Sequence, residues 1–249
     1  MNLEGENILV TGASRGIGKS IAIRLLESNA QVGIHYNKGA TEATELKAKY
    51  PLSEIFQADL SQMDEVQLLF ENAIDHFGSV DTIVLNAGVF IPHQIEDSTE
   101  KWLDIWRQTM AINLESAGLL TKMGIEHFKN RGGGRFIYIG SRAAFRGETE
   151  EYLAYAASKG GLTSLARTVA RSFGKYNIKS FVIAPGFTRT EMAEDAIRKY
   201  GEENILHEMA LKELTTPEDI APIAVLMCSG KMDHATGSTI DINAGSYIR

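Results

Sequence analysis

Short apolar runs rich in β-branched residues alternate along the chain with segments whose apolar residues recur at helical spacing. In one such segment Ile17, Ile21 and Leu25 occupy every fourth position, which places them on one helix face. Seven runs are predicted strands, at residues 8–10, 32–36, 55–56, 82–85, 136–139, 181–183 and 239–242. Strands that alternate with helices are typical of repeated βαβ units. The pattern predicts an α/β fold with a doubly wound, seven-stranded parallel sheet and helices on both faces.

No proline- or serine-rich linker interrupts this pattern, so we expect one domain over residues 1–249. The segment from about 189 to 214 differs from the rest because it is polar, charge-rich and helix-prone. It precedes Pro217, which is predicted to open a helix behind Thr216. We expect this segment to form a lid over the substrate. The alternative is an ordinary pair of surface helices.

The charge balance limits the possible partners. The chain has 25 basic and 32 acidic residues, a net charge of −7, which argues against nucleic acid and against a polybasic membrane anchor. A small-molecule substrate is expected instead. The six histidines lack metal-ligand spacing, and the single Cys228 lies in an apolar helical pattern that predicts a buried, inert thiol. Neither a signal peptide nor an apolar run of roughly 18 to 20 residues is evident, so the cytoplasm is the expected location.

A glycine-rich turn follows the first predicted strand and precedes a predicted helix. Its sequence is Thr11-Gly12-Ala13-Ser14-Arg15-Gly16-Ile17-Gly18. Gly12 permits a tight turn, Gly16 lets the backbone approach a pyrophosphate, and Gly18 lets helix and strand pack closely. The helix N-terminus then stabilises the phosphate charge. The spacing differs from the common G-x-G-x-x-G fingerprint, but its place at the start of a doubly wound pattern favours a dinucleotide-binding Rossmann fold over a turn without a ligand.

The end of the second strand indicates which dinucleotide binds. An acidic residue there would bond the ribose 2′-hydroxyl of NAD, whereas this strand ends His35-Tyr36-Asn37-Lys38. Arg15 and Lys38 could instead neutralise a 2′-phosphate. We therefore expect NADP(H) rather than NAD(H). The alternative is that both side chains are merely solvated.

Tyr155 and Lys159 stand four residues apart near the start of a helical segment that runs to about Phe173. This separation places the phenol and the ammonium on one helix face. A nearby positive charge favours the phenolate, so Lys159 is expected to lower the pKa of Tyr155 toward values useful for proton transfer. The spacing alone also arises by chance in many helices.

A larger set of motifs, taken together, indicates a protein family. The set comprises Thr11 to Gly18, Asp59-Leu60, Asn86-Ala87-Gly88, Asn113, Ser141, Tyr155 to Lys159, Pro185-Gly186 with Thr190, and Thr236-Gly237. In these motifs the chain resembles the short-chain dehydrogenase/reductases over essentially its full length, and most of all their 3-oxoacyl-[acyl-carrier-protein] reductase branch.

The resemblance implies roles for individual residues. The implied catalytic residues are Asn113, Ser141, Tyr155 and Lys159: Tyr155 protonates the substrate oxygen, Ser141 orients the carbonyl, Lys159 holds the nicotinamide ribose, and Asn113 holds a water that relays protons. The implied cofactor-binding residues are Gly12, Ser14, Arg15, Gly16, Ile17, Gly18, Tyr36, Asn37, Lys38, Asp59, Leu60, Asn86, Ala87, Gly88, Tyr155, Lys159, Pro185, Gly186, Thr188 and Thr190. Asp59 would bond the adenine amino group. Alternatively, Asn113 satisfies backbone groups, Ser141 ends a strand and Asp59 caps a helix.

Two departures from the family pattern, at Leu85 and Phe181, are expected to alter packing rather than chemistry, whereas a longer loop weakens the transfer of the family's substrate to this chain. Leu85 stands where the family usually has Asn, Phe181 stands where Asn is common, and the loop between Ser141 and Tyr155 is one residue longer than usual. Basic positions that would dock an acidic carrier are only approximated, by Arg131 and Lys175.

The expected function is NADPH-dependent reduction of a ketone or 3-oxoacyl group by a homotetramer. The alternatives are an alcohol, sugar or steroid dehydrogenase working oxidatively, and a non-catalytic NADP-binding sensor or scaffold.

Overall fold

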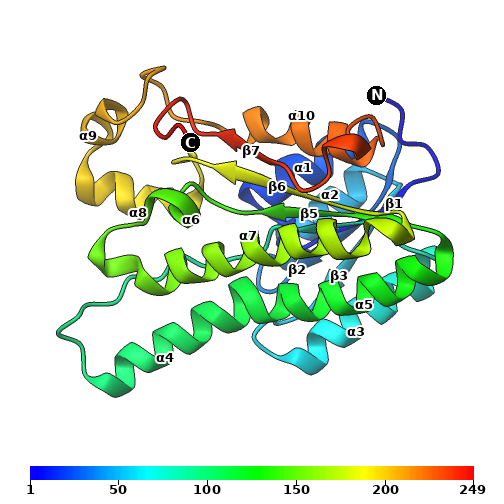
Figure 1. The fold of residues 1–249 in the computed structure, drawn as a ribbon, viewed down its shortest axis with the longest axis horizontal. Helices are drawn as coiled ribbons and strands as arrows, with labels where there is room; N and C mark the ends of the chain where they lie inside the picture. The colour runs from blue at the N-terminus through cyan, green and yellow to red at the C-terminus, as the bar shows by residue number, and fades with distance from the viewer.

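Seven parallel strands form one twisted sheet in the computed structural model (Figure 1). The structure describes the backbone of residues 1–249, and every side chain except those of Met192, Asp195, Ala196, Lys199 and Tyr200. The strands are β1 (Asn7–Val10), β2 (Gln31–Tyr36), β3 (Ser53–Gln57), β4 (Thr82–Leu85), β5 (Gly134–Ile139), β6 (Ile178–Pro185) and β7 (Thr239–Ile242). Their order in the sheet is β3-β2-β1-β4-β5-β6-β7, with every pairing parallel. The predicted Rossmann fold is confirmed.

The helices cover both faces of this sheet. They are α1 (Gly16–Leu26), α2 (Ala40–Lys49), α3 (Met63–Phe77), α4 (Thr99–Met110), α5 (Ser116–Arg131), α6 (Ala143–Arg146), α7 (Leu153–Phe173), α8 (Glu191–Tyr200), α9 (Glu202–His207) and α10 (Pro217–Cys228). A π-helical turn, η1 (Ala111–Glu115), joins α4 to α5, and three 3₁₀ turns are η2 (Glu150–Tyr152), η3 (Gly174–Tyr176) and η4 (Asp233–Ala235). The short α6 and the π-helical turn were not predicted from the sequence.

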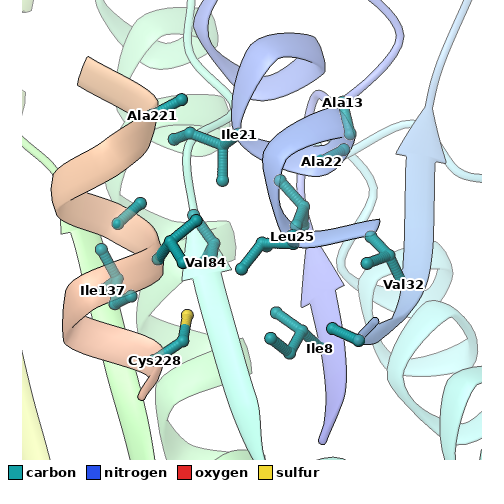
Figure 2. Packing of buried hydrophobic residues seen from close by; sticks show 14 of the residues in the cluster. Ile8, Ala13, Ile21, Ala22, Leu25, Val32, Val84, Ile137, Ala221 and Cys228 are labelled. Atoms are coloured by element: carbon teal, nitrogen blue, oxygen red, sulfur yellow. The ribbon is translucent and has the colours of Figure 1, made fainter. Parts of the chain in front are cut away.

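The core has two layers because successive side chains of a strand point to opposite faces of the sheet. Ile8 and Val10 of β1 pack in one cluster with α1 and α10, whereas Leu9 packs in a second cluster with α3, α5 and α7. Figure 2 shows the first layer, where Ile21 and Leu25 of α1 lie on the same face of the sheet as α10 and its residues Ala221 and Cys228. This burial on both faces explains why the strands appear in the sequence as continuous apolar runs.

Cys228 ends α10 inside the same layer, and its thiol is fully buried (Figure 2). Burial raises the pKa of this thiol well above its ordinary value. The predicted buried and inert thiol is therefore confirmed, since the nucleophilic form of cysteine is the thiolate.

The segment expected to be a lid is paired at its two ends and is also bonded to the chain after β7, where the Ala210 and Leu211 amides donate to the Ala244 carbonyl at 2.9 and 3.2 Å. Thr188 pairs with Thr215, and the Arg189 amide donates to the Thr215 carbonyl at 2.8 Å. Between these ends lie α8 and α9, and a small apolar cluster around Ile205 and Met209 packs them against Phe187 and Ala244, which lie outside the segment.

The carboxyl ends of the strands meet at one edge of the sheet. Strand order reverses between β1 and β4. Strands β2 and β3 lie on one side of this pair, and β5, β6 and β7 lie on the other. In doubly wound sheets, ligands bind in the crevice outside the carboxyl ends at such a reversal. The glycine turn after β1 and the Asn86 segment after β4 both lie there.

Candidate active site

A cavity of about 850 Å³ opens at this edge of the sheet, a size within the range of cofactor and ligand pockets. Residues far apart in the sequence converge on it. Of the residues predicted from sequence, those that line it are Gly12, Ser14, Arg15, Gly16, Ile17, Tyr36, Asn37, Lys38, Asp59, Leu60, Asn86, Ala87, Gly88, Ser141, Tyr155, Lys159, Pro185, Gly186, Thr188 and Thr190. Gly18 and Asn113 lie behind this lining and act on the site through other residues.

The glycine turn has the backbone that its sequence requires. Gly12 and Gly16 have φ of +63° and +53°, a region that favours glycine. A Cβ on Gly18 would lie 2.2 Å from the Gly12 carbonyl oxygen, so no other residue fits there without moving the turn. Asn86 fixes the turn from β4, because its Nδ2 donates to the Thr11 and Gly12 carbonyls at 2.8 and 3.0 Å. Asn86 therefore shapes the turn in addition to lining the cavity.

His35 is a second support for the turn, and the sequence analysis gave it no role. Its Nδ1 accepts from the Gly12 amide at 2.9 Å, and its Nε2 lies 3.0 Å from the Ala58 carbonyl, to which it donates. Burial lowers the pKa of His35 to about 4, so the neutral ring with its proton on Nε2 is the form that makes both bonds. The sequence places His35 at the end of the second strand, but it does not show which groups the His35 ring bonds to.

The two basic side chains expected at a 2′-phosphate both have acidic neighbours. Arg15 forms an exposed ion pair with Glu191 of α8 at 3.1 Å. Lys38 lies close enough to Asp59 to help lower the pKa of that carboxyl, although hydrogen bonds from Ser61 lower it most. Asp59 therefore caps the turn at Ser61, just before α3. The N-cap residue of α3 is Gln62, so Asp59 does not cap this helix itself.

Ser141, Tyr155 and Lys159 come together inside the cavity. Ser141 follows β5, and its hydroxyl accepts from the Ala143 amide at 3.1 Å, which orients it. Tyr155 and Lys159 lie on one face of α7, with the Lys159 Nζ 5.8 Å from the centre of the Tyr155 ring. The Phe90 ring packs edge-on against the Tyr155 ring, with 4.7 Å between the two ring centres.

The pKa of Tyr155 corrects one expectation from the sequence. Burial raises it to about 12, and a hydrogen bond with Ser141 acts in the opposite direction. The Lys159 Nζ donates to the Ile139 carbonyl at 2.8 Å, and burial lowers the pKa of the amine itself to about 8. Desolvation disfavours each charged form and dominates both shifts.

Asn113 lies in the π-helical turn and is fully buried. Its Oδ1 accepts from the Val89 amide at 2.7 Å, and its Nδ2 donates to the Val89 carbonyl at 3.0 Å and to the Ser158 hydroxyl at 3.1 Å. These bonds agree with the alternative in which Asn113 satisfies backbone groups. They fix the chain directly after Gly88 and link it to Ser158 of α7.

Charged side chains at the far end of the cavity were not given a role by the sequence analysis. They are Arg142, Arg146, Glu148 and Glu208. Arg142 directly follows Ser141, and this adjacency was the only sign in the sequence that the group borders the catalytic residues.

The described residues hold no candidate for a membrane span or for a metal site. No helix among them has the length and apolarity that a membrane-spanning helix needs. No group of three or more histidine, cysteine, aspartate or glutamate side chains in the described part of the chain is arranged to hold a metal ion.

Comparison with known proteins gives the same family from sequence and from structure. The family model described as enoyl-(acyl carrier protein) reductase matches residues 12–246. The 3-oxoacyl-[acyl-carrier-protein] reductase FabG of Staphylococcus epidermidis is 32% identical over 98% of this chain and 99% of its own. Glucose 1-dehydrogenase 2 of Bacillus subtilis is 28% identical over 99% of this chain and 96% of its own.

A solved structure extends this agreement to the fold. A candidate gluconate dehydrogenase from Agrobacterium tumefaciens superimposes with a TM-score of 0.90 at 26% identity, covering 98% of this chain and 97% of that one. These relatives are described as reductases and dehydrogenases, which supports an NAD(P)-dependent oxidoreductase that acts on CH–OH or C=O groups. The glycine turn, the Ser141, Tyr155 and Lys159 geometry and the full-length matches place this chain in the short-chain dehydrogenase/reductase family of oxidoreductases.

Proposed function

We propose that the protein is an NADPH-dependent carbonyl reductase that acts on a ketone or 3-oxoacyl substrate, with Tyr155 as the proton donor. The observation that supports this most is the convergence of Ser141, Tyr155 and Lys159 in the cavity that begins at the glycine turn. Neither the turn nor the three side chains would serve the reaction alone.

The residues around the glycine turn fit a dinucleotide. A Cβ on Gly12 would come within 3.0 Å of the Ala87 backbone, so glycine keeps the turn close to the segment after β4, and α1 begins at Gly16 in the lining of the same cavity. Helix N-termini bind phosphate through free amide groups and the helix dipole. When bound, the reduced nicotinamide supplies a hydride to the carbonyl carbon. Lys159 would hold its ribose, and Pro185, Gly186, Thr188 and Thr190 would border its ring.

The remaining chemistry belongs to the chain. With a pKa near 12, Tyr155 carries its proton at neutral pH and can donate it to the carbonyl oxygen as the alcohol forms. Ser141 donates a hydrogen bond to the same oxygen and fixes its position. Lys159, with a pKa near 8, can return a proton to Tyr155 after each turnover. Asn113 positions the segment after Gly88 against α7.

Substitution of Tyr155 tests the proposal. Tyr155→Phe keeps the ring that packs on Phe90 but removes the proton donor, so kcat should fall by about 10²- to 10⁴-fold. Affinity for NADPH, measured by fluorescence titration, should persist. Tyr176→Phe, on the turn after α7, is the matched control and should keep full activity. Wild-type turnover in Tyr155→Phe on any good carbonyl substrate would contradict the assignment.

The preference for NADPH rests on Arg15 and Lys38, because a positive charge binds a 2′-phosphate and no carboxylate ends β2. Lys38→Ala should weaken binding of NADPH more than binding of NADH. Equal losses for the two cofactors would show that Lys38 does not contact the 2′-phosphate.

Oxidation of an alcohol or sugar is the second candidate, because two of the relatives are described as glucose and gluconate dehydrogenases. Tyr155 with its proton is the form that reduction uses, whereas oxidation uses the phenolate. Initial rates in both directions at cellular cofactor ratios separate the two. The third candidate, a sensor that binds NADP without turnover, does not account for the Tyr155 and Lys159 pair, and a broad carbonyl screen with no NADPH consumption would favour it.

Several features of the assembly belong to the same proposal. We take residues 1–249 as a single functional unit, with residues 189–214 as a lid, of which Glu191, Ile205 and Glu208 line the cavity. The protein is proposed to be a homotetramer, as the family resemblance implies. A cytoplasmic location stays a prediction, which cell fractionation would test.

A further inference from the structure

Two arginines and two glutamates form one cluster at the substrate end of the cavity. Arg142 donates from Nη2 to a carboxylate oxygen of Glu208 at 3.3 Å. Arg146 donates from Nη1 to the same oxygen at 3.2 Å, and from Nη2 to Glu148 at 3.3 Å. All four side chains line the cavity that contains Tyr155.

Arg142 is an unusual residue for this position because its guanidinium is buried. Only 5% of the residue is exposed, and its Nη1 has no hydrogen-bond partner among the described residues. A buried guanidinium is costly unless an anion pairs with it and its donors are used. Burial and the neighbouring Arg146 lower the pKa of Arg142, a sign of the same cost. The site is therefore short of one hydrogen-bond acceptor.

The present partner of Arg142 comes from a different part of the chain. Glu208 follows α9 at the end of the lid helices, 66 residues from Arg142, and its side chain is 52% exposed. The helices α6, α8 and α9 lie together beyond the carboxyl end of the sheet (Figure 1). Glu148, in contrast, belongs to the same loop as the arginines and is only 15% exposed.

The charges of this cluster balance only while Glu208 is in place. Without Glu208, two guanidinium groups face one carboxylate, and the cavity gains one net positive charge beside Ser141. One oxygen of Glu208 already accepts from both arginines, so the position of a bound carboxylate is defined. Guanidinium groups bind carboxylates in two-pronged geometry, and the unpaired Nη1 supplies the second donor.

We propose that the substrate carries a carboxylate, which Arg142 and Arg146 bind in the place that Glu208 takes in this structure. This inference rests on the proposed function and narrows it: the substrate is an oxo acid. A hydride reaches its keto carbon, a proton from Tyr155 reaches its keto oxygen, and a hydroxy acid leaves. Glu208, at the end of the lid helices, pairs with the two arginines until the substrate carboxylate displaces it.

Pairs of substrates that differ only in this charge test the inference. Oxo acids with the ketone two to five carbons along the chain, such as acetoacetate and 4-oxopentanoate, are compared with their methyl esters by NADPH consumption. The wild-type protein should prefer the best acid over its ester by at least about 10-fold in kcat/KM, the range for hydrogen bonds to a charged group. Equal kcat/KM for acids and esters would overturn the inference and leave the carbonyl reductase standing.

Variants then assign the preference to residues, measured as the acid-to-ester ratio of kcat/KM so that any loss of folded protein cancels. Arg142→Gln and Arg146→Gln should each lower the ratio by about 10- to 100-fold. Arg142→Lys keeps the charge without the planar fork and should give an intermediate ratio. Glu208→Gln removes the competing carboxylate and should raise the ratio roughly two- to fivefold, because the pair it breaks is half-exposed.

The matched control is Arg24→Gln, which makes the same change of charge on the exposed side of α1 and should leave the ratio as it is in wild type. A preference that survives Arg142→Gln and Arg146→Gln would show that another group selects the acid. Preference for hydroxyacetone phosphate over every oxo acid would replace the carboxylate by a phosphate and overturn the inference.

Binding without turnover separates the two proposals. Calorimetric titration of 4-oxopentanoate into protein loaded with NADP⁺ should show binding that Arg142→Gln weakens and that Tyr155→Phe retains. If no carbonyl compound is turned over, the proposed function fails, and this titration still decides whether the arginines bind a carboxylate. No difference in binding between wild type and Arg142→Gln would end the inference.

Discussion

Buried ionisable side chains at this site are tuned mainly by loss of water. Tyr155, Lys159 and His35 all shift toward their neutral forms, as desolvation predicts for a phenol, an amine and an imidazole. The shift keeps Tyr155 protonated as an acid and leaves Lys159 able to change protonation near pH 8. For His35 it fixes the one tautomer that supports the glycine turn.

His35 also links stability to pH. The folded protein holds this ring neutral with a pKa near 4, whereas in the unfolded chain it takes up a proton below about 6.5. The unfolded state binds more protons between these values, so this contribution is complete above pH 6.5 and is lost as the pH falls to 4, with a total of about 3 kcal/mol. His35→Gln should lack this part of the pH dependence of the free energy of unfolding, measured by urea denaturation.

His234→Gln, at an exposed histidine, is the control for His35→Gln and should follow the wild-type curve. A wild-type slope between pH 4 and 6.5 that His35→Gln leaves unchanged would show that the turn does not depend on a neutral ring.

At the level of elements, α10 shows how a local signal fixes the start of a helix. Thr216 precedes Pro217, and the Asp219 carboxylate accepts from the Thr216 amide and hydroxyl at 2.7 and 2.8 Å. The helix then presents Ile220, Ala224 and Cys228 to α1 and the sheet. Proline is suited to the first helical position, and a side chain three residues past the cap satisfies the free amide there.

Removal of this cap should destabilise the protein modestly. Asp219→Ala is expected to lower the free energy of unfolding by about 1 kcal/mol, the usual cost of a lost helix cap, as measured in urea at pH 7. Glu218→Ala removes a carboxylate from the same first turn but not the bonds to Thr216, so it separates the cap from the general effect of charge on the helix dipole. Equal losses in the two variants would mean that the bonds to Thr216 add nothing.

On the scale of the whole molecule, the order of strands brings the site together. Gly12 follows β1, Asn86 follows β4, Ser141 follows β5 and Pro185 ends β6, and these are neighbouring strands of one parallel sheet. All four therefore reach the same edge. The oligomer is predicted to use another surface, the outer sides of α5 and α7, which lie on one face of the sheet (Figure 1).

Light scattering tests this oligomer, with an expected mass four times that of the chain. A Cβ on Gly160 of α7 would meet no atom within 4 Å, so Gly160→Arg fits the single chain and improves helix propensity. Placed in an interface, the arginine should reduce the mass to that of a smaller assembly. Leu68→Arg on the exposed side of α3 is the control and should keep the tetramer mass. A wild-type protein with the mass of one chain would contradict the tetramer.

The sequence predicted the seven strands, the glycine turn and the shared face of Tyr155 and Lys159, since periodicity and short spacing act within one element. It missed α6 because four residues are too few for a periodic pattern. It was wrong about the cause that sets the pKa of Tyr155, because burial depends on what packs around a residue and not on its neighbours in sequence.

The sequence by itself determined the local structure: which helices and strands form, where the glycine turn lies, and that Tyr155 and Lys159 share a helix face. Only the tertiary structure decided how much water reaches each charged group, and that Glu208 meets Arg142 across 66 residues. The physical reason is the distance along the chain over which each effect acts. Propensity and spacing act over a few residues, whereas desolvation and ion pairing depend on distances that exist only once the sheet and its helices have packed.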